Sequence, residues 1–166
     1  NIKEQRFAQG GSTITQQLAK NFFLSPQKTI ARKLREVELA LALELRYTKK
    51  QLLEMYLNKI YLGQAGARGI YGVEEAAGFY FSKRARDLSL DEAALVAAII
   101  HAPNRYVISR NHKTAKDRRD KVLSRMKKLA MISENDFLRA SNAPVKFQSR
   151  SVPVHLSSYF IDYIQR

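Results

Sequence analysis

The sequence predicts a mainly α-helical protein, and three observations support this fold class. Apolar residues recur at steps of three and four positions along most of the chain, which is the spacing of one helix face. Several of these stretches begin with helix-start signals, such as Ser or Thr followed three residues later by Gln or Glu. No convincing strand pattern and no internal repeat interrupts the helical periodicity.

The composition agrees with one folded domain or part of one. The chain has 166 residues, of which 45% are hydrophobic, enough for a core and too many for a disordered segment. It contains no cysteine, which excludes disulfides, thiolate metal sites and a cysteine nucleophile. No apolar run reaches the ~18–20 residues of a spanning helix. The opening NIKEQRFAQGG resembles the continuation of a longer chain.

The first predicted helix follows GGST at residues 10–13, which supplies a flexible entry and an N-cap. Its apolar face consists of Ile14, Leu18 and Phe22. Another face carries hydrogen-bonding groups and one cation, where a solvated helix usually carries Glu and Lys: Thr13, Gln17, Lys20 and Asn21. That polar stripe is a candidate for binding a polar ligand.

Two more helices are predicted before residue 61. Ser25 provides an N-cap, and Pro26 suits the first helical position after it. An apolar stripe then runs to about Arg46 through Ile30, Leu34, Val37, Leu41 and Leu45. Thr48 and Gln51 form a capping box that opens the third helix, which continues to Ile60.

The middle of the chain is predicted to contain a loop and two helices. Four glycines between residues 63 and 72 predict a loop, and a short helix follows over 73–81. Ser89 and Glu92 form a second capping box before the apolar stretch EAALVAAII, which predicts a central buried helix ended by Pro103.

The last third is predicted to be less regular. Residues 104–112 lack a clear pattern, and a basic amphipathic helix follows over 113–130. Ser133 caps a short helix to about Ala140, after which residues 142–155 are predicted to be extended.

The charge balance implies an anionic partner. Lys and Arg number 29 and Asp and Glu 15, giving a net charge of +14. Nucleic acid, an acidic lipid surface and a phosphorylated substrate all fit this excess. Basic side chains are dense in residues 1–35 and again in 105–128.

The second predicted helix brings together two cations and a carboxylate. Arg32, Lys33 and Glu36 share one face at i, i+1 and i+4. The simpler interpretation is a surface ion pair between Arg32 and Glu36, which contributes a few tenths of a kcal/mol. The functional interpretation joins these residues to Lys20 and the polar stripe as a pocket for a phosphorylated sugar, because cations neutralise phosphate and amides bind sugar hydroxyls.

Other polar and aromatic residues favour structural roles. The three histidines are far apart and show no metal-ligand spacing. Glu74 and Glu75 suit the start of a helix better than a pair of catalytic carboxylates. The aromatic residues at helical spacing are predicted to lie in the core: Tyr56, Tyr61, Phe79, Tyr80 and Phe81.

Four stretches resemble consecutive motifs of the peptidoglycan glycosyltransferases, the glycan-polymerising domains of class A penicillin-binding proteins. These are GGSTITQQLAKN (10–21), RKLREVELALALE (32–44), KKQLLEMYLNKIYLG (49–63) and GVEEAAGFYFSK (72–83). The resemblance continues through LSLDEAALVAAII and RRDKVLSRM and covers most of the chain. It implies a lysozyme-like helical domain over residues 1–141 with a small membrane-facing jaw. Residues 142–166 would then be a linker toward a transpeptidase domain.

The resemblance also assigns roles to individual residues. Five residues match the motif that lines the donor site: Ser12, Thr13, Gln17, Lys20 and Asn21. Arg32, Lys33 and Glu36 match the motif that binds the donor diphosphate and supports catalysis. Residues of the later motifs are expected to be mainly structural: Asn58, Tyr61, Glu74 and Lys83.

The implied reaction is the inverting transfer of a growing glycan from a polyprenyl diphosphate to the 4-hydroxyl of lipid II. A divalent cation, Mg²⁺ or Mn²⁺, would be bound mainly through the substrate diphosphate. The implied location is the outer face of the bacterial cytoplasmic membrane, where the basic chain would meet anionic lipid. Moenomycin-type inhibitors are expected ligands, and nucleic acid is not.

Three departures from the family pattern leave alternatives open. The first motif of the family carries a catalytic glutamate base, and this sequence has no counterpart of it. Glu36 would be a weak base, because Arg32 and Lys33 favour its charged form.

Ser82 replaces the usual glycine, and the loop GQAGARGIYG is slightly long, with glycines that suit a mobile channel wall. The alternatives are a lysozyme-like lytic enzyme, a remnant of the fold that only binds, and a nucleic-acid-binding helical domain.

Overall fold

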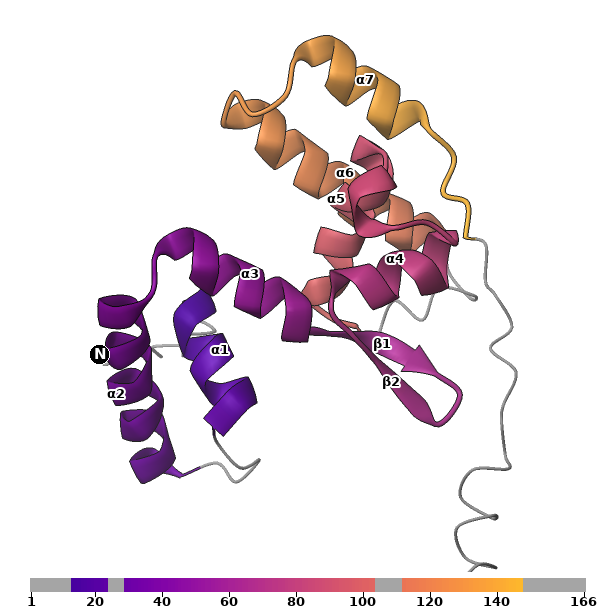
Figure 1. Ribbon diagram of the computed structural model, residues 1–166. Coiled ribbons are helices and arrows are strands. Elements are labelled where there is room, and N and C mark those ends of the chain that lie inside the picture. The colour runs from indigo at the N-terminus through magenta and orange to yellow at the C-terminus, as the bar shows by residue number, and fades with distance from the viewer. Residues whose placement is uncertain (1–12, 24–28, 104–111, 148–166) are drawn as a thin grey trace, which may run out of the picture. The chain divides into compact units, whose positions relative to one another are not determined.

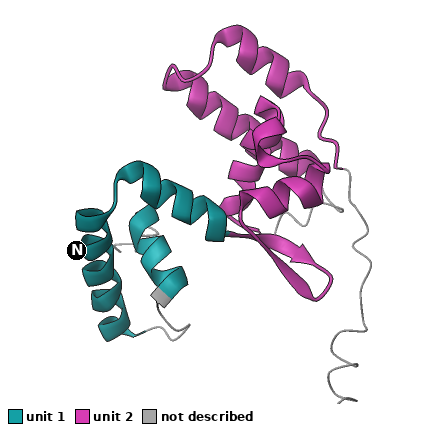
Figure 2. Ribbon diagram, viewed as in Figure 1, with its two compact units in different colours: residues 1–60 teal, residues 61–166 magenta. Residues whose placement is uncertain are grey.

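The computed structural model describes residues 13–23, 29–103 and 112–147 (Figure 1). In these ranges seven α-helices, one short 3₁₀ helix and one two-stranded sheet are found, which confirms the mainly α class. The chain divides into two compact units, residues 1–60 and 61–166 (Figure 2). None of the helices in the described ranges has the length and apolar character needed to cross a membrane.

The first unit consists of three helices, α1 (Ile14–Phe23), α2 (Ile30–Arg46) and α3 (Lys49–Lys59). α1 packs against both α2 and α3. The buried apolar residues come from all three helices: Leu18, Ala19, Ala40, Leu52 and Tyr56.

Side-chain caps begin each helix of the first unit. The Thr13 hydroxyl accepts the Gln16 N–H at 3.1 Å, and Gln16 Oε1 accepts the Thr13 N–H. The predicted capping box of Thr48 and Gln51 is confirmed. α2 begins later than predicted, because Thr29 caps it and Ile30 is its first residue. Ser25 and Pro26, the predicted start, lie outside the described residues.

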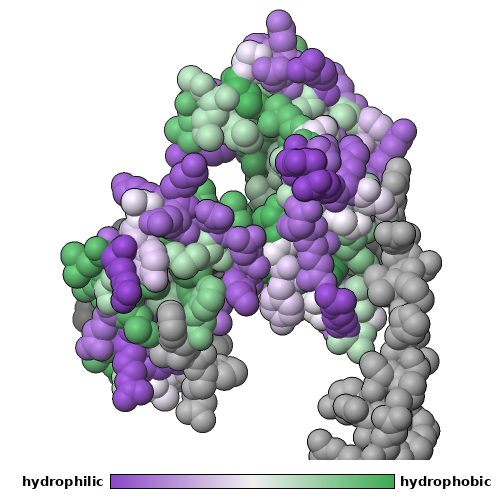
Figure 3. All heavy atoms as spheres, viewed as in Figure 1, coloured by the Kyte–Doolittle hydropathy of each residue, from purple (hydrophilic) through white to green (hydrophobic). Residues whose placement is uncertain are grey.

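The predicted apolar stripe of α2 is exposed in the first unit. Its members are 37% to 91% exposed: Ile30, Leu34, Val37, Leu41 and Leu45. Green apolar side chains reach the surface where α2 lies (Figure 3). The buried side of α2 instead carries Glu36 and Ala40. Periodicity shows which residues share a face, but it does not show which face α1 covers.

The predicted loop over residues 63–72 is wrong, because most of it forms a hairpin. β1 (Tyr61–Ala65) pairs antiparallel with β2 (Arg68–Tyr71). Gly66 has φ +63° and starts the two-residue turn, which suits the twist of a tight hairpin. Two strands this short, with a bulge between Tyr61 and Gly63, leave no regular alternation to detect in the sequence.

Gly63 is required by a close approach rather than by loop mobility. It has φ +140°, and a Cβ atom added there would lie 2.2 Å from the hydroxyl oxygen of Tyr80. That hydroxyl donates to the Leu62 carbonyl at 2.8 Å. Burial, with Tyr61 nearby, raises the pKa of Tyr80 to about 12, so this hydroxyl remains a donor at neutral pH.

The predicted helix over 73–81 is confirmed as α4 (Val73–Phe81), and Ser82 ends it in the left-handed conformation with φ 54°. The Ser82 N–H donates to the Gly78 carbonyl and the Lys83 N–H to the Ala77 carbonyl. Glycine is favoured at a position with positive φ because it has no Cβ atom. Serine at residue 82 therefore departs from the family pattern at a position where glycine would fit better.

Replacing Ser82 by Gly is expected to raise the free energy of unfolding by about 0.5–1 kcal/mol, because glycine adopts a positive φ without a Cβ clash. Urea denaturation measures this change. The matched control is Ala93→Gly at an exposed position inside α5 (Leu90–Ile100), where the same residue should cost about 1 kcal/mol. A loss of stability in the Ser82 variant would contradict this account.

The predicted capping box at the start of α5 is confirmed, and Lys83 also donates a hydrogen bond to its glutamate, Glu92. A 3₁₀ turn (Ala85–Asp87) separates α4 from α5. Glu92 accepts the Ser89 N–H at 2.9 Å and the Lys83 ammonium at 2.8 Å. Burial alone would raise the pKa of Glu92, but the hydrogen bonds from Lys83 and Ser89 outweigh it and lower the pKa.

Replacing Glu92 by Gln is expected to destabilise the protein at pH 7 and to have less effect in acid. The lowered pKa means that Glu92 stabilises the fold above its unfolded pKa, and this contribution is lost as pH falls through the folded pKa. Urea denaturation across the acid range should show the two proteins converging. Glu54→Gln, at an exposed carboxylate, is the control. A difference that persists in strong acid would argue against the ionic contribution.

The second unit is completed by α6 (His112–Lys128) and α7 (Glu134–Asn142), close to the predicted bounds. Ala94 of α5, Leu123 of α6 and Ala140 of α7 are buried together. Partly buried residues pack around them: Leu90, Val122, Ile132 and Phe137. α7 therefore packs against α6, and α5, α6 and α7 all contribute side chains to one core.

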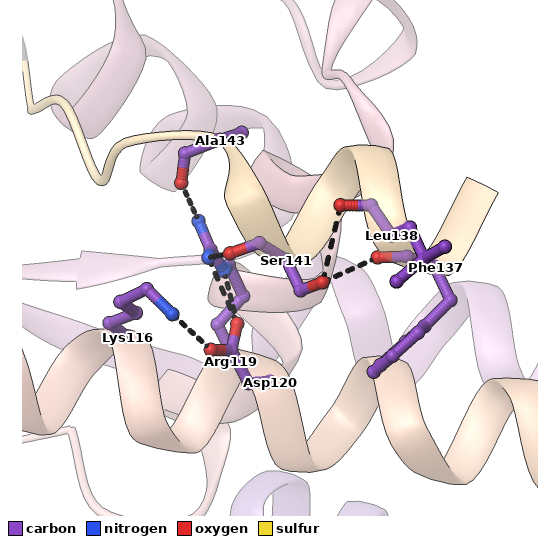
Figure 4. Close-up of polar contacts among 7 residues, drawn as sticks. All are labelled: Lys116, Arg119, Asp120, Phe137, Leu138, Ser141 and Ala143. Atoms are coloured by element: carbon purple, nitrogen blue, oxygen red, sulfur yellow. Dashed lines mark hydrogen bonds and ion pairs between the residues drawn. The ribbon is translucent and has the colours of Figure 1, made fainter. Parts of the chain in front are cut away.

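Arg119 of α6 holds the end of α7 (Figure 4). Its side chain is 1% exposed, and its two terminal nitrogens donate at 2.7 Å to the carbonyls of Ser141 and Ala143. Its Nε donates at 2.9 Å to Asp120, which also pairs with Lys116. A buried guanidinium with all three of these nitrogens bonded fixes the last turn of α7 onto α6.

Candidate substrate-binding site

The carboxylate of Glu36 is the buried centre of the candidate site on α2. Glu36 is 3% exposed, whereas the simpler of the two interpretations of the sequence placed it in a surface ion pair. Lys33 Nζ donates to Glu36 Oε1 at 2.5 Å, and Arg32 Nη1 lies 3.9 Å from Oε2. The simpler interpretation of a surface ion pair with Arg32 is therefore wrong in two respects: the carboxylate is buried, and its nearer partner is Lys33.

The two cations differ in what they offer to a ligand. The Lys33 side chain is 53% exposed, so its ammonium contacts both solvent and the buried carboxylate. The Arg32 side chain is 19% exposed, and its Nε is buried without a hydrogen-bond partner in the described part of the chain. A buried donor without an acceptor is uncommon and costs free energy unless a water or ligand satisfies it. Lys33 can donate to an anion through its exposed ammonium, and Arg32 can do so through the exposed part of its side chain.

The predicted polar stripe of α1 is divided between internal contacts and solvent. The Thr13 hydroxyl caps α1, and Gln17 Oε1 accepts the Tyr56 hydroxyl at 3.1 Å. Lys20 and Asn21 are exposed. Ser12 lies outside the described residues.

Tyr56 contributes a hydrogen bond between α3 and α1 that the sequence did not reveal. It is 5% exposed, as its apolar spacing predicted, but its hydroxyl joins α3 to Gln17 of α1. Burial raises the pKa of Tyr56, so the hydroxyl stays protonated and donates. Helical spacing indicates only that the ring is buried, and it gives no signal for the acceptor of the hydroxyl.

Residues of the later motifs make contacts within the protein. The ring of Tyr61 packs against that of Tyr71 in a tilted arrangement, with 5.4 Å between the ring centroids, and Glu74 accepts the Ala85 N–H at 3.0 Å. Lys83 pairs with Glu92, and Asn58 is exposed on α3. Three of these four residues therefore hold neighbouring segments in the second unit or at its start.

The donor set around Glu36 does not suit a protein-held divalent cation. Mg²⁺ prefers several oxygen ligands, whereas this part of α2 offers one carboxylate that is already bonded to Lys33. Among the described residues, no three His, Cys, Asp or Glu side chains are placed to hold a metal ion.

Comparison with known proteins finds similar sequences over most of this chain. Residues 1–127 match the family described as Transglycosylase. The chain is 44% identical over 165 residues to penicillin-binding protein 1A of Aquifex aeolicus, covering 99% of this chain and 22% of that protein. It is 42% identical over 148 residues to penicillin-binding protein 1B of Vibrio cholerae, covering 89% and 19%. The chain thus spans about a fifth of the length of these relatives.

A solved structure supports the same relationship. The crystal structure of penicillin-binding protein 1A from Haemophilus influenzae matches with a TM-score of 0.54 and 26% sequence identity. The match covers 92% of this chain and 18% of that one.

Proposed function

Because this chain belongs to the transglycosylase family, we propose that it is the glycan-polymerising part of a class A penicillin-binding protein. It transfers a growing glycan from its polyprenyl diphosphate to the 4-hydroxyl of lipid II, with inversion at the anomeric carbon. The observation that carries this proposal is the α2 cluster, in which a buried Glu36 holds the half-exposed Lys33 beside Arg32.

The cations act on the leaving group. Negative charge develops on the diphosphate as the glycosidic bond breaks, and donors fixed before the reaction stabilise it without reorganising. Lys33 is held by Glu36 and is half exposed, and Arg32 keeps 19% of its side chain exposed, so both can bind a phosphate oxygen. Lys20, exposed on α1, adds a third cation. Each such donor contributes about 2.7–4 kcal/mol to lowering the barrier.

Glu36 is proposed to position Lys33 rather than to act as the base. The Glu36 carboxylate already accepts from the Lys33 ammonium at 2.5 Å, so it is engaged in holding that side chain in place. None of the 166 residues matches the glutamate that the family uses to deprotonate the acceptor hydroxyl. The uncharged groups of the donor motif bind the sugar, where a carboxylate would repel the diphosphate: Ser12, Thr13, Gln17 and Asn21.

A divalent cation, Mg²⁺ or Mn²⁺, would reach this site with the substrate. Its ligands would be mainly diphosphate oxygens and water, because α2 offers no free carboxylate pair. When bound, the ion would neutralise part of the diphosphate charge, and Lys33 and Arg32 would bind the remaining oxygens.

The proposed setting is the outer face of the bacterial cytoplasmic membrane. The substrate is lipid-linked, and the net charge of +14 favours contact with anionic headgroups. We propose a small membrane-facing jaw in the parent protein and a transpeptidase domain joined after residues 142–166. The relatives are named penicillin-binding proteins, which supports that second domain.

The proposal is tested with the 166-residue chain and two ligands. Calorimetry should detect binding of moenomycin, because Lys20, Arg32 and Lys33 are present, and a lipid II assay should detect no polymer, because no residue matches the family base. Arg32→Ala should abolish moenomycin binding, whereas Arg35→Ala on the same helix should not. Cleavage of free glycan would favour a lytic enzyme, and robust polymer would make Glu36 the candidate base.

A further inference from the structure

The second unit carries an apolar turn next to a cationic helix face. Leu129 and Met131, in the turn between α6 and α7, are 54% and 66% exposed. We call residues 129–131 the apolar tip. The turn lies at one end of the α6–α7 pair (Figure 1). Ala130 has φ 54°, and the Met131 N–H donates to the Met126 carbonyl, so a defined helix cap holds the tip in place.

Three cations on α6 lie next to this tip. Lys121, Arg125 and Lys128, here called the cationic stripe, recur at steps of four and three and are exposed. No ion-pair partner is found for them among the described residues. The opposite face of α6 is buried through Ala115, Arg119 and Leu123, so the stripe points to solvent.

The stripe lines an open hollow whose charge changes along the helix. The hollow has a volume of about 640 Å³. Asp117 and Asp120 line its start, and Ser124 and the three cations line the part toward the tip. From Lys121 to Ser133 the sequence contains four cations and no acid. The first acid after the tip is Glu134, which pairs with Lys127 at 3.0 Å.

From these observations we infer that the apolar tip and the cationic stripe form a docking surface for an anionic phospholipid bilayer. Headgroup phosphates bind Lys121, Arg125 and Lys128, and Leu129 and Met131 enter the boundary between headgroups and acyl chains. Exposed apolar side chains flanked by cations are what an interfacial membrane contact requires.

The exposed stripe of α2 has a different charge setting, which argues against the same role. Its exposed neighbours at three or four positions carry both signs: Glu38 and Glu44 lie beside Leu34 and Leu41, whereas Lys33, which is bonded to Glu36, lies beside Ile30 and Val37. Carboxylates at that place are repelled by an anionic leaflet. Of the two apolar surfaces, the one in the second unit is therefore complementary to anionic lipid.

This inference deepens the proposed function and rests on it for one point, that an enzyme with a lipid-linked donor works at a bilayer. The vesicle experiments below need no lipid II turnover. Vesicle binding through the tip without polymerisation would contradict the proposed function alone, and polymerisation without a lipid contact at the tip would contradict this inference alone.

The first experiment places a fluorescent probe at the tip. The chain contains no Trp, so Met131→Trp introduces a single reporter at an exposed position. With vesicles containing about one third phosphatidylglycerol, its emission should shift to the blue and be quenched by brominated lipid. The matched probe Leu45→Trp, on the α2 stripe, should show neither change. A response at residue 45 and none at residue 131 would overturn the inference.

The second experiment removes the charge of the stripe. The variant Lys121→Gln, Arg125→Gln, Lys128→Gln should bind the phosphatidylglycerol vesicles about a hundredfold more weakly and lose most of its salt dependence. Binding to pure phosphatidylcholine vesicles should change little. Circular dichroism verifies the fold. Parental vesicle binding together with lost binding to an oligonucleotide would assign the stripe to a soluble polyanion and overturn the inference.

Discussion

Replacing Lys33 by Ala in a full-length parent enzyme is expected to lower polymerisation at least about a hundredfold. Its ammonium is fixed 2.5 Å from the buried Glu36 while its side chain remains 53% exposed, so it is positioned before the substrate arrives. The loss should appear mainly in kcat, because the charge it stabilises develops as the diphosphate leaves. A continuous lipid II assay measures the effect.

Two variants separate this role from general damage to α2. Arg35→Ala removes an exposed cation of the same helix and should leave turnover near the parental value. Glu36→Gln keeps the volume but removes the partner of Lys33, and it should also be severely impaired. Near-normal turnover of the Lys33 variant would refute its role, and near-normal turnover of the Glu36 variant would show that Lys33 needs no positioning.

Replacing Arg119 by Ala is expected to lower the free energy of unfolding of the second unit by about 3–5 kcal/mol. The change leaves the Ser141 and Ala143 carbonyls without their donor and opens space beside the buried Leu123. Urea denaturation followed by circular dichroism measures the loss. Hydrogen exchange should show that α7 loses protection before α5 does, because α7 depends on this contact for its last turn.

The controls for Arg119 test whether geometry or charge matters. Arg119→Lys keeps the charge but offers its donors from a single nitrogen instead of the three nitrogens of a planar fork, so it should also be strongly destabilised. Lys113→Ala, at an exposed position of the same helix, should change the stability by less than about 0.5 kcal/mol. A Lys variant as stable as the parent would show that the guanidinium fork is not the source of the stability.

Several helix starts were predictable because their signals are local, although α2 is not among them, since Thr29 and not Ser25 caps it. The pairs Thr48–Gln51 and Ser89–Glu92 form the capping boxes that their spacing predicted. The hairpin at 61–71 was not predictable in the same way, because its strands are short, bulged and rich in glycine. The exposure of the α2 stripe also escaped prediction, since it depends on which side of α2 is covered by α1.

The candidate site was predictable as a set of residues and not as a set of contacts. Sequence spacing placed Arg32, Lys33 and Glu36 on one side of a helix, and they do lie together. It did not show that Glu36 is buried or that Gln17 is bonded to Tyr56, 39 positions away. Contacts between distant segments depend on tertiary packing, and a single sequence carries no direct signal for them.

The Arg119 contact bears on where this fold can be cut for expression. The family match ends at residue 127, inside α6, yet two of the acceptors of Arg119 come from residues 141 and 143. A fragment trimmed to the family match would leave a buried guanidinium without those acceptors and Leu123 without the cover of Ala140. The smallest fragment of the second unit that folds autonomously should therefore extend at least through Ala143, and boundaries set by homology alone should give insoluble protein.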